Sequence, residues 1–218
     1  MTEPDFEALR LDQLRQLATK GSTLTADEWA SPSLCTDWRL VDVVAHITLG
    51  YTTPMDVLGE IIAAHGGDIA EASRVASIGF ADEHGSEALL ALLDRVIDER
   101  IKEGISLQIP VPGLFYDHVI HLADMLVPVG QATGTSEAAL AAAFLTVPQQ
   151  GGFVGADARA DGLRLHATDL DLRVGDDGPE VAGPAESLLL AVSGRPAGLD
   201  HLDGDGVAVL ATRTNPPA

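Results

Sequence analysis

The chain has 218 residues, of which 46% are hydrophobic, so it can form one large domain or one medium and one small domain. Its formal net charge of −20 argues against nucleic acid and anionic membranes as partners, because both require a basic surface. The single cysteine, Cys35, excludes an internal disulfide and favours a reducing compartment. No signal core or membrane-spanning stretch is evident, and we therefore expect a cytoplasmic protein.

Apolar residues at helical spacing dominate the first two thirds of the chain. They predict helices over residues 6–20, 40–47, 54–62, 86–101, 115–125 and 136–144. Thr36 or Asp37 is expected to cap the second of these helices. Residues 66–85 are polar and weakly periodic, and they are predicted to form a loop.

After Pro148 the pattern changes, beginning with a glycine-rich linker. Apolar and polar residues alternate over 163–168 and 170–174, which predicts two strands, and a turn at 176–179 indicates that these segments form an antiparallel unit. A helix is expected over Pro184 to Val192 and a last strand over 207–211. The predicted fold class is α+β, with a helical domain at 1–148 followed by a small α/β domain with an antiparallel sheet at 158–213.

Three side chains in the helical part form a candidate metal site. Asp117 and His121 are four residues apart and therefore share one face of the predicted helix, and His46 lies on another apolar helix. Two imidazoles and a carboxylate are a ligand set of catalytic zinc sites, which keep a fourth position open. A structural alternative remains, because the helix dipole favours Asp117 near a helix start and an Asp–His pair one turn apart is an ordinary surface contact.

Three further residues could support or join such a metal site. Asp124 is placed to hold the second ring nitrogen of His121, or it is a solvated helix charge. His118 points about 100° away from Asp117 on a helix, so it is a weaker ligand. Cys35 has no second cysteine or nearby histidine in sequence, which favours a buried small hydrophobic residue over a nucleophile.

Three blocks of the sequence resemble one known family. The run SLCTDWRLVDVVAHI is similar to the opening of the mycothiol-dependent maleylpyruvate isomerase family, whose helical domain is a DinB-like metal-binding bundle. DHVIHLADM resembles the second metal block of that family, and GLRLHATDLDLRV with the segments that follow looks like its C-terminal domain, which is related to sterol-carrier proteins. The blocks occur in the right order and cover most of the chain.

The resemblance implies a four-helix bundle that binds zinc or a similar divalent metal through His46, Asp117 and His121, with mycothiol at the open position. The isomerase has a glutamate where this chain has Asp117, which is one methylene shorter. The implied reaction is isomerisation, or S-transfer by a transferase, on a small electrophilic substrate such as maleylpyruvate. A metal lowers the pKa of a bound thiol, and the resulting thiolate adds to an electron-poor double bond.

Arg195, just past a predicted helix end, is the candidate for stabilising negative charge that develops during this reaction. It is equally well placed to compensate the carboxyl end of that helix. The expected partners are a small-molecule substrate and a low-molecular-weight thiol, in a monomer or homodimer. Two alternatives are a metal-binding protein without catalysis, whose small domain holds an apolar ligand, and a metal-free helical interaction protein.

Overall fold

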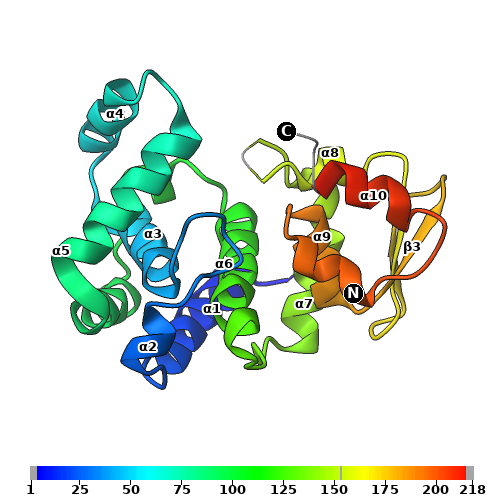
Figure 1. Cartoon of the computed structure of the whole chain (residues 1–218), viewed down its shortest axis with the longest axis horizontal. Coiled ribbons are helices and arrows are strands. Elements are labelled where there is room, and N and C mark those ends of the chain that lie inside the picture. Colours follow the sequence, from blue (N-terminus) through cyan, green and yellow to red (C-terminus); the bar gives the residue numbers. More distant parts are fainter. Residues whose placement is uncertain (1–3, 153, 215–218) are drawn as a thin grey trace. The chain divides into compact units, whose positions relative to one another are not determined.

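The computed structural model describes residues 4–152 and 154–214, and Figure 1 labels its α-helices and the strand β3. The chain divides into two compact units. The helical unit comprises residues 6–114 and 121–133. The α/β unit comprises the described parts of 1–5, 115–120 and 134–218, so residues 134–148, assigned by sequence to the helical domain, lie in it. The α+β class predicted from the sequence is confirmed.

The helical unit is built from helices that mostly match the predicted ones. They are α1 (Phe6–Gly21), α2 (Ala26–Trp29), α3 (Leu40–Thr52), α4 (Met55–Ala64), α5 (Ile69–Asp98) and α6 (Val111–Leu126), with short 3₁₀ turns at Gly104–Leu107 and Val127–Val129. The helix α6 is continuous and carries residues of both units.

The predicted loop over residues 66–85 is wrong. Helix α5 begins at Ile69, where the side chain of Asp68 caps it by accepting the backbone N–H of Glu71 at 3.0 Å. The buried positions of this half of α5 are small residues, Ala72, Ser77 and Ala81, so their hydrophobic signal is weak. At Gly85 the helix kinks, with φ of 71° and ψ of 166°, a conformation open essentially only to glycine.

The predicted cap of the second helix is also wrong. Helix α3 begins at Leu40, and Asp37 lies before it in a left-handed turn with φ of 63°. The backbone N–H of Arg39 donates to the buried carboxylate of Asp42 at 2.7 Å, and the Arg39 guanidinium pairs with the same carboxylate. Asp42, inside the first turn of α3, therefore takes the capping role that was expected of Thr36 or Asp37 before the helix.

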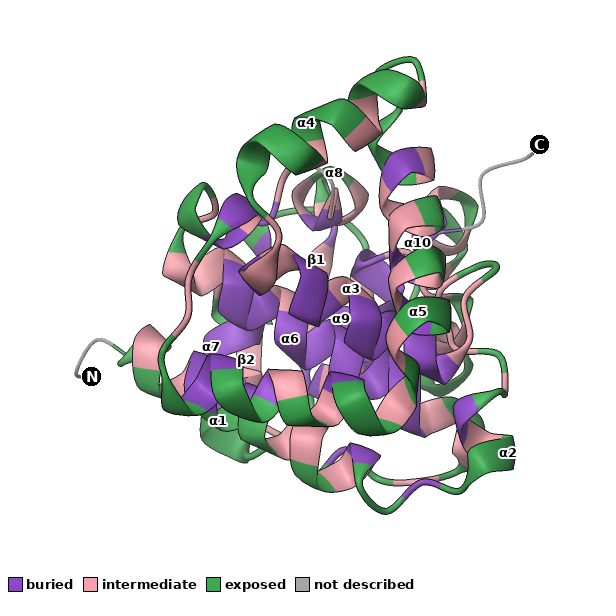
Figure 2. Ribbon diagram, turned by 90° about the vertical axis from the view of Figure 1, so that its left-hand side faces the viewer, coloured by how far each residue is buried: buried purple, intermediate pink, exposed green. Residues whose placement is uncertain are grey.

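The core of the helical unit fills the space between four of its helices. It is built mainly from leucine and valine of α1, α3, α5 and α6, including Leu14, Leu17, Leu40, Val44, Leu89, Leu93 and Leu122. Figure 2 shows these buried segments in purple, whereas α4 is green and pink and contributes no buried residue. Burial of each such leucine stabilises the unit by about 1.5–3 kcal/mol relative to exposure, and this core holds α3 and α6 together.

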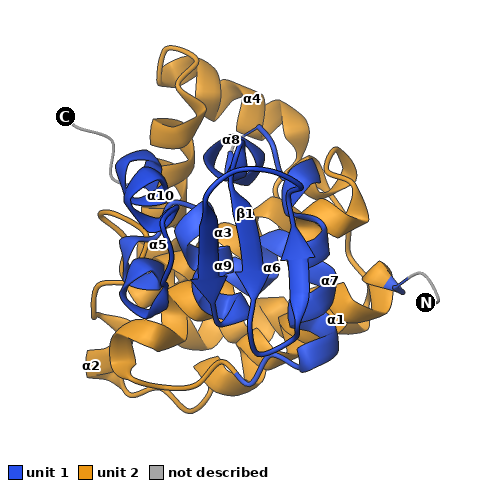
Figure 3. Ribbon diagram, turned by 90° about the vertical axis from the view of Figure 1, so that its right-hand side faces the viewer, with its two compact units in different colours: residues 1–5, 115–120, 134–218 blue, residues 6–114, 121–133 orange. Residues whose placement is uncertain are grey.

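Among its described residues, the α/β unit has a three-stranded sheet, four helices of its own and part of α6 (Figure 3). They are β1 (Arg164–Ala167), β2 (Leu172–Val174), β3 (Glu180–Gly183), α7 (Glu137–Leu145), α8 (Ala156–Ala160), α9 (Ala185–Val192) and α10 (Val207–Thr214), with 3₁₀ turns at Val147–Gln149 and Pro196–His201. The strand order is β2-β1-β3. The antiparallel pairing of β1 with β2 is confirmed, but β3 was missed and pairs parallel to β1, so the sheet is mixed.

The strand predicted over residues 207–211 is wrong, because this segment is helix α10. Its alternating pattern of valine and alanine fits either structure, and burial selects the helix: Leu210 and Thr214, four residues apart, are the buried positions. Within the part of the chain that the structure describes, no helix combines the length and the apolarity needed to cross a bilayer.

Candidate metal centre

The three predicted ligands are brought together by α3 and α6. Asp117 and His121 lie one turn apart on α6, and His46 lies in the second turn of α3. Each offers one ligand atom, and these atoms all lie within 4.8 Å of one another. The rings of His46 and His121 meet edge to face with centroids 5.0 Å apart. Ligand atoms around a tetrahedral zinc ion are about 3.4 Å apart, so a small adjustment of side chains suffices for binding.

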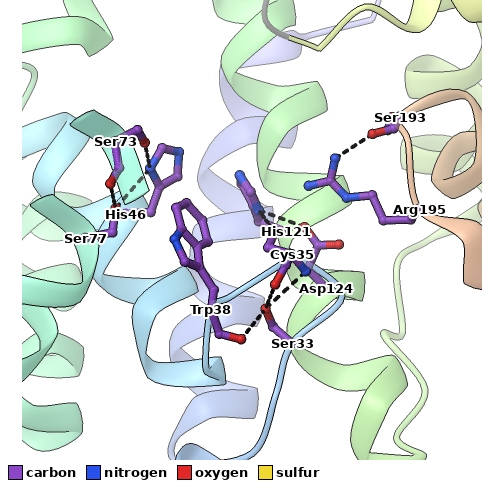
Figure 4. Close-up of polar contacts among 10 residues, drawn as sticks. All are labelled: Ser33, Cys35, Trp38, His46, Ser73, Ser77, His121, Asp124, Ser193 and Arg195. Carbon is purple, nitrogen blue, oxygen red and sulfur yellow. Dashed lines mark hydrogen bonds and ion pairs between the residues drawn. The ribbon is translucent and has the colours of Figure 1, made fainter. Parts of the chain in front are cut away.

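Helix α5 supplies polar partners to His46, and sequence reasoning missed them. The Nδ1 atom of His46 lies 3.2 Å from Oγ of Ser73 and 3.4 Å from Oγ of Ser77 (Figure 4). The two serines are four residues apart and therefore face the same way from α5. No sequence signal was available, because residues 66–85 were assigned to a loop.

The imidazole ring of His121 is held by the carboxylate of Asp124. Nδ1 of His121 lies 2.9 Å from Oδ2 of Asp124, which is fully buried. Asp124 is therefore not the solvated helix charge that the sequence left open. A carboxylate that accepts from one nitrogen of a histidine orients the ring and makes the other nitrogen a better metal ligand.

Cys35 forms a second group of potential ligands with His121 and Asp124, contrary to its interpretation as a small apolar residue. Its Sγ lies 3.1 Å from Oδ2 of Asp124 and 3.9 Å from Nδ1 of His121. The thiol is half-buried, and it donates to the carboxylate (Figure 4). Cys35 and His121 are separated by 86 residues, so their proximity could not be read from local spacing.

Trp38 forms an apolar wall beside the two histidines. Its ring centroid lies 5.0 Å from that of His46 and 6.2 Å from that of His121. Its indole Nε1 is buried and, among the described residues, makes no hydrogen bond. The loop of residues 30–39, which carries Trp38 and Cys35, also lines a surface hollow of about 520 Å³. An apolar wall lowers the local dielectric and strengthens electrostatic interactions at the histidines.

Arg195 lies in the α/β unit, where its Nη1 donates to the backbone oxygen of Ser193 at 2.6 Å. Ser193 is the C-cap residue that directly follows α9, so this contact matches the alternative in which Arg195 compensates the carboxyl end of that helix. The hydroxyl of Tyr116 lies 2.9 Å from Oγ of the same serine. Burial raises the pKa of Tyr116 to about 12, although the hydrogen bond with Ser193 and the charge of Arg195 act to lower it.

His118 is buried but belongs to neither cluster of potential ligands found in the described residues. The donor set of His46, Asp117 and His121 fits a divalent ion that accepts nitrogen and oxygen ligands. The buried carboxylate of Asp124, in contact with His121, supports this fit, because a metal-binding histidine usually donates its other ring N–H to such a group. The contacts among Cys35, His121 and Asp124 are already explained by hydrogen bonds to the carboxylate.

Comparison with known proteins finds one family model and one fold that this chain resembles. Residues 10–103 match the family model of the mycothiol maleylpyruvate isomerase N-terminal domain. The fold is similar to a crystal structure of the mycothiol-dependent maleylpyruvate isomerase and to that of a histidine-to-alanine mutant of it. Each match has a TM-score of 0.52 and 17% identity and covers 93% of both chains. No curated protein matches the chain. Residues 10–103 of this chain are therefore similar to the mycothiol maleylpyruvate isomerase N-terminal domain, and the chain as a whole shares the fold of the isomerase.

Proposed function

We propose that this protein is a metal- and mycothiol-dependent isomerase or S-transferase that acts on a small electrophilic, maleylpyruvate-like substrate. The observation that carries the proposal is the convergence of His46, Asp117 and His121 in a chain whose residues 10–103 match the family model of the mycothiol maleylpyruvate isomerase N-terminal domain. These three residues would hold a divalent ion, and we propose zinc because two imidazoles and one carboxylate suit it. When bound, such an ion lowers the pKa of a coordinated thiol and so supplies a thiolate at neutral pH.

When bound, mycothiol would supply the thiol that adds to an electron-poor double bond of the substrate. Its addition and later departure would give the cis–trans isomer with no net change in composition. Retention of its sulfur, with the thiol proton placed on the substrate carbon, would give a thioether, which is the S-transfer outcome.

The residues of the chain would hold the reacting groups and stabilise charge. Asp124 orients His121 through Nδ1, and Trp38 excludes water from one side of the histidines. We propose that Arg195 stabilises the substrate carboxylate or the developing enolate, as a positioned cation does for charge that forms during a reaction.

The proposal is tested first by metal analysis of the purified protein. We expect about one divalent ion per chain, and loss of that ion from a His46→Ala, His121→Ala double variant. Retention of stoichiometric metal by the double variant would refute the ligand assignment. Turnover of maleyl-type acceptors should require a low-molecular-weight thiol and should disappear after treatment with a chelator. Metal binding without any thiol-dependent turnover would favour a non-catalytic metal protein.

A further inference from the structure

We infer that Ser73 and Ser77 of α5 are positioning residues that fix the tautomer of His46 and thereby set the metal affinity of the centre. The inference rests on the proposed metal centre and deepens it. It concerns a part of α5 for which the sequence offered no functional role, and every contact that carries it lies within the helical unit.

The direction of the hydrogen bonds follows from the bonding capacity of the Ser77 hydroxyl. This hydroxyl has one proton, and it donates that proton to the backbone oxygen of Ser73 at 2.7 Å. Toward Nδ1 of His46, 3.4 Å away, it can then only accept. Turning the hydroxyl toward His46 would exchange the short bond for a longer and weaker one. Oγ of Ser73 at 3.2 Å can donate or accept, so the Ser77 contact is the one that places the proton of neutral His46 on Nδ1 in this inference, with Ser73 as a second acceptor.

A neutral imidazole has one protonated nitrogen, so a proton on Nδ1 leaves the lone pair on Nε2. His121 is arranged in the same way, because its Nδ1 faces the carboxylate of Asp124. Both histidines then offer Nε2 as the ligand atom. The two rings are held by different chemistry, two neutral hydroxyls for His46 and a buried carboxylate for His121.

Loss of the hydroxyls would leave His46 free to place its proton on either nitrogen and to turn about its side-chain bonds. Metal binding would then have to select the Nδ1-protonated form and its orientation, which lowers the affinity. Removing groups that orient a metal-binding histidine typically costs 10–100-fold in metal affinity, and we expect about that loss for the pair.

The test compares the Ser73→Ala, Ser77→Ala double variant with Ser106→Ala. Ser106 is a matched control, because it is buried in the same unit and its hydroxyl donates to the backbone oxygen of Glu103 instead of contacting a histidine. Zinc affinity is measured by competition with a chromophoric chelator. The expected result is a loss of about 10–100-fold for the double variant and no comparable loss for the control. Equal affinities of the double variant and the wild-type protein would overturn the inference.

A second measurement separates this inference from the proposed function. In metal-free protein at a pH where the imidazole is neutral, the ring nitrogen chemical shifts of His46 report which nitrogen carries the proton. We expect the Nδ1-protonated form in the wild-type protein and in Ser106→Ala, and a mixture in the double variant. A wild-type protein whose His46 is protonated on Nε2 would refute the inference even if metal binds. A protein that binds no metal but shows the expected tautomer would refute the proposed function and the effect on metal affinity, while the role of the serines in fixing the tautomer would stand.

Discussion

Replacing Asp117 and Asp124 separately by asparagine tests which carboxylate contacts the metal. Both residues lie on α6, seven positions apart, and each substitution removes one negative charge with little change in size. We expect Asp117→Asn to weaken zinc binding more than Asp124→Asn does. The reason is that Asp117 would contact the ion directly, whereas Asp124 acts through Nδ1 of His121.

The magnitudes follow from the contacts of each carboxylate. Asp124 is fully buried, and its Oδ2 accepts from His121 at 2.9 Å and from Cys35 at 3.1 Å. An asparagine can still accept through Oδ1, so the orientation of His121 is weakened but not lost. We therefore expect Asp124→Asn to lower the zinc affinity by about 10–100-fold, the usual effect of such orienting groups. Asp117→Asn removes a charged ligand and should exceed that range.

The assay is competition for zinc between each variant and a chromophoric chelator at fixed pH. Thermal unfolding of the metal-free proteins serves as the control for folding, and it should show both variants folded. Equal zinc affinities of the two variants would refute the assigned hierarchy. A larger loss for Asp124→Asn would indicate that Asp124 is the ligand, together with Cys35 and His121.

Three further predictions concern other parts of the chain. Arg195→Ala should lower thiol-dependent turnover by about 10²–10³-fold with unchanged metal content, and normal turnover with a slightly lower melting temperature would show a structural role. Gly85→Ala should destabilise the protein by about 1–3 kcal/mol because of its backbone conformation. The control Gly79→Ala, inside the same helix with open space around it, should stabilise by about 0.5–1 kcal/mol, and equal melting temperatures would contradict this reasoning. The pKa of Glu7 is lowered to about 2, mainly by the hydrogen bond from Arg10. The ionised Glu7 carboxylate therefore stabilises the folded protein fully above the ordinary pKa of this group, and this stabilisation is lost as the pH falls through about 2. Glu7→Gln should therefore lower the free energy of unfolding at pH 7 by about 1 kcal/mol, allowing for solvent screening, and by less in acid. Urea unfolding at several pH values measures this loss, and a loss that does not depend on pH would argue against the ion pair.

Helical periodicity alone was sufficient to predict α1, α6 and α7, and to place Asp117 and His121 on one face of α6. Such spacing is a local property, because residues four apart in a helix share a face whatever surrounds them. His46 entered as a candidate through its apolar helix and the family resemblance. The structure brings these residues together, and their role as ligands stays a prediction.

Tertiary structure decided what local patterns left open. The segment of α10 reads equally well as a strand, and the burial of Leu210 and Thr214 selects a helix. Parallel pairing of β3 with β1 depends on a partner distant in sequence. For the same reason the contact of Cys35 with Asp124 and that of Ser73 with His46 were not predictable. Each joins side chains whose separation in the sequence carries no periodic signal, and only the packing of α3, α5 and α6 around a common core brings them within hydrogen-bonding distance.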